Sequence, residues 1–226
     1  FLLYDSLTVN NEFPTESEAA LLILIEFFGT ENLSEEIVTQ IRNLGYSKCL
    51  LRIAINQENY FECIKLSLDL RLAAVFNFVE AFYETRKGDN TTLSMNRSFL
   101  DVNGRIGNDT EIADYELERM IYDNFVKFYE IDNQKAVELI YFYDYDIKTV
   151  FDNLSEIKTK VDILRTIVDD SRFEVPNFLC ALYIKNTFEI FGKTRESIEQ
   201  IEKMLDNITF TSGNFLEIVK ELKAQH

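Results

Sequence analysis

Start and stop signals of α-helices recur along this chain, and between them apolar residues return every three or four positions. Thr15 to Glu18 matches the Ser/Thr-x-x-Glu pattern of a capping box, and Gly29 follows the apolar run Ala19 to Phe28. Ser34 is placed to cap a second helix that stops at Gly45. Residues three and four apart share one face of a helix, so this pattern predicts amphipathic helices.

The same signals predict helices in most of the chain. After the second helix, which runs to about Asn43, the predicted helices are about Tyr46 to Ile55, Tyr60 to Leu68, Leu72 to Lys87, Glu111 to Tyr129, Asn133 to Tyr143, Ile147 to Asp152, Glu156 to Val168, Pro176 to Phe191, Thr194 to Leu205 and Asn214 to Ala224. Further caps are expected at Asp132 and Ser155, with Gly88 and Gly192 as stops. Two prolines and seven glycines in 226 residues are too few for strands joined by tight turns. The sequence therefore predicts an all-α fold.

The predicted helices are joined by short breaks, which favour antiparallel neighbours. Several helices are apolar on more than one side, as expected where each helix touches neighbours on both sides. We therefore expect an irregular α-solenoid of stacked antiparallel helix pairs, although no repeat of fixed length is visible. Residues 88–113 are polar and rich in turn formers. We interpret them as a long loop within a single domain of residues 1–226, with a domain boundary as the alternative.

The charge of the chain constrains its partners. The formal net charge is −16, the wrong sign for neutralising phosphates or for attraction to an anionic membrane surface. Nucleic acid is therefore not an expected ligand. The longest apolar run, Ala19 to Ile25, is too short to cross a bilayer, so no transmembrane segment is expected.

The number and spacing of the cysteines bear on whether the chain resides in an oxidising or a reducing compartment. Cys49, Cys63 and Cys180 are widely spaced and odd in number, and each lies in an apolar stretch. No CxxC or Cys/His pair suggests a metal site. We expect buried thiols in a reducing compartment.

The sequence offers little for catalysis. The single histidine, His226, is the last residue, and no glycine-rich phosphate loop is present, so we expect no enzyme activity, no cofactor, no metal and no small-molecule substrate. The pairs Asp144/Asp146 and Asp169/Asp170 are compatible with a carboxylate-held metal in a hydrolase. We favour the alternative that they lie at solvated helix ends.

Two segments are candidates for protein binding. In the predicted helix from Pro176 to Phe191, apolar residues wrap around the axis, so one side is available for a partner segment unless the helix is central. The candidate groove residues are Phe178, Leu182, Phe188 and Phe191. The aromatic run Tyr141 to Tyr145 is a second candidate docking or stacking surface, although packing at the end of a helix hairpin is the interpretation we favour.

Three stretches resemble the carboxy-terminal helical region of the Nic-type inner-ring linker nucleoporins. The first contains Phe28 to Leu33, Tyr46 to Ile55 and Tyr60 to Ile64, followed by Ala74 to Phe76 in place of the family's Ala-Val-His. The second, Lys127 to Val137 continued by Tyr141-Phe142, is similar without gaps, with Asn133 in place of a proline. The third comprises Thr187-Phe188 and Ile201 to Leu205. The region from Tyr145 to Phe173 is shorter than in the family, and the family's amino-terminal part is absent, as expected of a divergent or truncated member.

The resemblance implies a structural scaffold or adaptor of the nuclear pore inner ring, located at the nuclear envelope. Its implied partners are other scaffold nucleoporins or their short linear segments. A subunit of another helical assembly, such as a vesicle coat, a tether or a ribosome-biogenesis complex, is the alternative from the same structural class.

Overall fold

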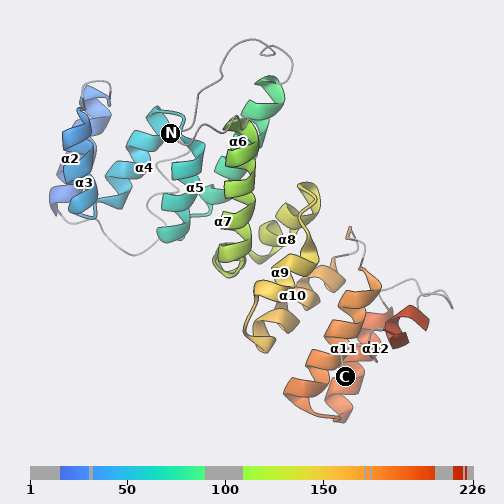
Figure 1. Ribbon diagram of the computed structural model, residues 1–226. Coiled ribbons are helices and arrows are strands. Elements are labelled where there is room, and N and C mark those ends of the chain that lie inside the picture. Colours follow the sequence, from blue (N-terminus) through green and yellow to red (C-terminus); the bar gives the residue numbers. More distant parts are fainter. Residues whose placement is uncertain are drawn as a thin grey trace. The chain divides into compact units, whose positions relative to one another are not determined.

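The computed structural model describes residues 16–30, 33–89, 109–170, 172–173, 175–206, 216–220 and 222, with the backbone alone at 86–89 and 109–113. Every regular element in these ranges is a helix, as predicted (Figure 1). The helices are α2 (Glu16–Phe28), α3 (Glu35–Asn43), α4 (Ser47–Asn56), α5 (Tyr60–Asp69), α6 (Ala74–Asp89), α7 (Asp109–Ile131), α8 (Asn133–Phe142), α9 (Ile147–Asn153), α10 (Ile157–Asp169), α11 (Asn177–Phe191) and α12 (Arg195–Asp206). None of the described helices is long and apolar enough to cross a membrane.

The chain divides into two compact units, Phe1–Met120 and Ile121–His226. In the first unit, α4 packs against α2, α3 and α5, and α5 packs against α6. The interior of this unit is apolar because each helix turns its periodic face toward these neighbours. Its most buried side chains include Cys49, Leu51, Ile53, Ile64, Leu68, Val75 and Val79.

Local signals of the first unit behave as the sequence predicts. Ser34 Oγ accepts a hydrogen bond of 3.4 Å from the backbone N–H of Ile37, which makes Ser34 the cap of α3. Gly29 and Gly45 take φ values of 74° and 72° just beyond α2 and α3, a conformation that side chains disfavour. Asn59, which lies between two of the predicted helices, caps α5 by accepting from the N–H of Glu62.

In the second unit, α10 packs against α8, α11 and α12, and α11 packs against α12. The carboxy-terminal part of α7 belongs to this unit, beginning near the non-helical backbone of Asn124 that interrupts the helix. Fully buried side chains of this unit include Phe125, Phe128, Ile140, Ile163, Leu164, Ile167 and Leu179. Helix α10 is therefore the centre of the unit, because three helices pack against it.

Capping in the second unit both confirms and corrects the predictions. Asp132 caps α8, as predicted. Thr194 precedes α12 and is not its first residue, and its Oγ1 accepts from the N–H of Ser197. Ser155 is not the cap of α10, because Glu156 occupies that position and its backbone carbonyl accepts from Lys160. Pro176 is the cap of α11 and not its first residue, because its ψ of 148° is extended while its carbonyl already accepts from Leu179.

The predicted loop at 88–113 is corrected at both ends. Helix α6 continues past Gly88 to Asp89, and α7 begins at Asp109, so both predicted boundaries lie inside helices. Residues 90–108 lie outside the described part of the chain. Of the predicted last helix, Leu216–Lys220 and Leu222 are helical, and its other residues lie outside the described ranges. The single-domain interpretation stays a prediction.

Candidate functional site

Helix α11 carries the groove residues that the sequence singled out. Its buried side chains face α10 and α12, while Phe178, Leu182 and Phe188 are half-buried and Phe191 is 38% exposed. Successive residues of a helix turn by about 100°. Phe178 and Leu182 therefore point to one side of α11, and Phe188 and Phe191 point to another. The structure places all four on one helix but does not bring them into one continuous face, so the groove stays a prediction.

A cleft does lie beside α11, between it and both of its neighbours. It encloses about 270 Å³ and is lined by Arg165, Val168, Asp169, Tyr183, Gln200, Lys203 and Met204. None of the four predicted groove residues lines it. Arg165 Nη2 donates to Gln200 Oε1 at 3.3 Å across its edge. The floor is apolar and the rim carries both signs of charge, a mixed lining that specifies no particular ligand.

The two predicted carboxylate pairs serve helix ends and turns. Asp146 caps α9 by accepting from the N–H of Lys148, and Thr149 Oγ1 donates to it at 2.6 Å. These bonds lower the pKa of Asp146, the Thr149 hydroxyl contributing most. Its neighbour Asp144 adopts a positive φ of 54° in the preceding turn. Within the described ranges, no group of His, Cys, Asp and Glu side chains is arranged to hold a metal ion.

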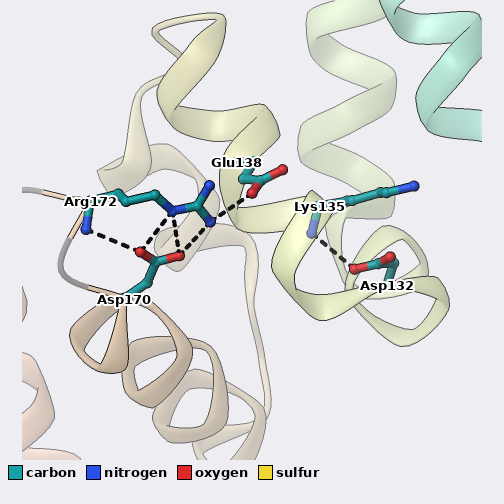
Figure 2. Close-up of polar contacts among 5 residues, drawn as sticks. All are labelled: Asp132, Lys135, Glu138, Asp170 and Arg172. Atoms are coloured by element: carbon teal, nitrogen blue, oxygen red, sulfur yellow. Dashed lines mark hydrogen bonds and ion pairs between the residues drawn. The ribbon is translucent and has the colours of Figure 1, made fainter.

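The two carboxylates of the second pair, Asp169 and Asp170, have different surroundings. Asp169 is exposed at the end of α10, whereas Asp170 accepts from Arg172 Nη2 at 2.6 Å and from Arg172 Nε at 2.9 Å. Figure 2 shows the same guanidinium reaching Glu138 of α8, where the Nη2 to Oε1 distance is 2.7 Å. The hydrogen bonds from Arg172 lower the pKa of Asp170. This cluster therefore fastens the turn after α10 to α8.

Some residues of the aromatic run at the end of α8 pack against other rings, and one is exposed to solvent. Tyr141 stacks on Phe173 with ring centroids 4.4 Å apart, and Tyr145 meets Tyr122 edge to face at 5.7 Å. Phe142, by contrast, is exposed. Packing thus accounts for Tyr141 and Tyr145, in line with the favoured interpretation, but not for Phe142.

Helix α2 carries an apolar surface that sequence reasoning missed. Ile23, Leu24, Phe27 and Phe28 are 63%, 51%, 81% and 67% exposed. With the exposed Ala20 they follow the spacing i, i+3, i+4, i+7, i+8, and we call these five residues the α2 stripe. Nearly every position from 19 to 28 is apolar, and this is the signal in the sequence that could have indicated a second apolar face on the helix.

In comparisons with known proteins, no family model, no curated protein and no solved structure matches this chain.

Proposed function

We propose that this chain is a structural scaffold that binds other proteins through helical surfaces and performs no turnover. The observation that carries the proposal is the order of helix packing. The pairs α3 and α4, α4 and α5, α5 and α6, α10 and α11, and α11 and α12 pack as neighbours along the chain, and α2 and α4, α8 and α10, and α10 and α12 pack across one intervening helix. Nearest-neighbour packing of this kind is characteristic of an α-solenoid built from stacked helix pairs, a fold widely used for extended binding surfaces.

The proposed setting is the inner ring of the nuclear pore, at the nuclear envelope. This part of the proposal rests on the sequence resemblance to the Nic-type linker nucleoporins, since fold alone does not name a function. Two of the resembling stretches correspond to the junction of α7 and α8 and to the pair α11 and α12. The proposed partners are other scaffold nucleoporins or their short segments. The three buried free thiols support a reducing compartment.

The test is affinity purification of the full chain from nuclear-envelope extract with identification by mass spectrometry. Recovery of inner-ring nucleoporins is the expected result. Recovery of vesicle-coat or pre-ribosomal subunits would keep the scaffold role and overturn the setting. Recovery of neither, together with turnover of a small molecule, would overturn the scaffold proposal.

A matched pair of variants tests the predicted groove on α11. Phe191→Asp places a charge on a partly exposed apolar position and should abolish capture of the partner without loss of helicity by circular dichroism. Tyr115→Asp, which alters an exposed aromatic residue of α7, should leave capture unchanged. Equal capture by both folded variants would remove α11 from the binding surface.

A further inference from the structure

Helix α2 is apolar on two sides, but α4 covers only one of them. Its buried residues, Glu18 and Ile25, face α4, where Glu18 meets the backbone N–H of Lys48. The α2 stripe lies on the opposite side of the helix. Helices that are apolar all round are normally buried, so the stripe has the composition of an interface and the exposure of a surface.

The stripe has the form used in helix-to-helix recognition. Its spacing gives a continuous face two turns long, and its widest side chains, Phe27 and Phe28, pack edge to face with centroids 5.0 Å apart. A partner helix that inserts its own apolar residues beside such a face buries aromatic area on both sides. The shape of the surface therefore favours a helix as its occupant.

Charge decides between the possible occupants. Helix α2 contains no Lys or Arg. Its exposed acidic residues are Glu16 and Glu26, and Glu26 lies 3.9 Å from Arg52 of α4. Helices that lie on anionic membranes carry basic residues beside their apolar face, which α2 does not. A second copy of this chain brings the same net charge of −16 and is repelled at long range. A helix flanked by Lys and Arg is attracted to this surface and steered toward it.

We propose that the α2 stripe docks an amphipathic helix of a partner protein, with an apolar face of Leu, Ile or Phe flanked by Lys and Arg. The inference deepens the proposed scaffold function and rests on it, and it adds a contact on α2, in the unit that does not contain α11. The net negative charge of the chain favours basic partners, and the stripe supplies the apolar area that holds them.

The probe is a synthetic helical peptide with leucines at heptad a and d positions and lysines beside them. One control peptide has glutamates in place of the lysines, and a second has the same residues as the probe in an order without helical periodicity. The full chain should bind the probe at least about tenfold more tightly than either control at physiological salt. Phe27→Asp should weaken binding of the probe at least about tenfold. Ile198→Asp, which adds the same charge at an exposed position of α12, should not.

Several outcomes would overturn the proposal. Equal binding by both variants would mean that net charge alone attracts the peptide. A wild-type dimer in analytical ultracentrifugation that Phe27→Asp dissociates would identify a second copy as the occupant. A wild-type chain that ignores the probe, combined with a lowered Tm in Phe27→Asp, would mean that residues 1–15 of the same chain cover the stripe.

Different experiments would overturn the docking surface on α2 and the nuclear-pore setting. Specific peptide binding at α2, together with an affinity purification that recovers no nucleoporin, would keep the docking surface and overturn the nuclear-pore setting. Recovery of nucleoporins that is equally strong with Phe27→Asp, together with no binding of the probe, would keep the setting and overturn the docking surface.

Discussion

The carboxylate of Glu18 in α2 accepts a hydrogen bond of 2.9 Å from the backbone N–H of Lys48, in the first turn of α4. The residue at the cap position of α4 is Tyr46, whose side chain makes no capping bond. A helix start leaves backbone N–H groups without partners inside the helix. Here a side chain thirty positions earlier satisfies one of them, so the cap of α4 is also the contact that fastens α4 to α2.

Removing this carboxylate should destabilise the chain. We expect Glu18→Ala to lower the free energy of unfolding by about 1–2 kcal/mol, because the Lys48 N–H loses its acceptor in a largely buried place. Glu18→Gln retains an acceptor oxygen and should cost less. Urea denaturation followed by circular dichroism measures both variants, with the exposed Glu202→Ala as a control expected to stay within about 0.5 kcal/mol. Equal losses from Glu18→Ala and Glu202→Ala would contradict the capping role.

The hydroxyl of Tyr129 connects α7 to α10. It donates to the backbone carbonyl of Asp162 at 3.0 Å and lies 2.6 Å from Thr166 Oγ1. We expect Tyr129→Phe to lower the free energy of unfolding by about 1 kcal/mol, the usual net value of such bonds. The exposed Tyr115→Phe is the matched control and should be neutral. Thermal denaturation of the two variants side by side makes the comparison, and identical Tm values would refute the contribution of this hydroxyl.

The ion pair between Asp170 and Arg172 predicts a pH dependence. Hydrogen bonds from Arg172 lower the pKa of Asp170, so the folded state favours the ionised carboxyl. The resulting stabilisation is present above the pKa of Asp170 in the unfolded chain and is lost as pH falls through its lowered pKa in the folded chain. Arg172→Ala should raise the pKa of Asp170 toward its ordinary value, measured by carboxyl-carbon NMR titration. Arg195→Ala, which removes an exposed ion pair with Glu199, should leave the pKa of Asp170 unchanged.

The three thiols should be unreactive in the folded chain. Cys49, Cys63 and Cys180 are buried, and burial raises the pKa of their thiols to about 12, 12 and 11. The thiolate is the reacting form, so a disulfide reagent at mild alkaline pH should modify almost none of them within minutes. Addition of urea should unfold the chain and expose all three thiols, which should then react with the reagent together. A rapid phase in the native protein would contradict the burial of at least one cysteine.

The sequence by itself determined the helices and most of their ends. Ser34 and Asp132 cap helices because each side chain bonds a backbone N–H three residues on. Gly45 stops α3 through its own backbone conformation. Interactions confined to one turn depend on no distant part of the chain, so the local sequence contains all the information they require. The predictions at Ser155 and Pro176 failed by a single position, within the range over which neighbouring residues compete to begin a helix.

Only the tertiary structure decided which apolar faces are covered. Periodicity reports that two sides of α2 are apolar, but the packing of α4 leaves the α2 stripe exposed. The carboxylate of Glu18 accepts from the backbone N–H of Lys48 only because α4 packs against α2. In the same way, the guanidinium of Arg172 reaches Glu138 only because α8 packs against α10. Burial and long-range hydrogen bonds depend on which helix packs against which. The apolar sequence pattern of a single helix is the same whether or not a neighbour covers its face.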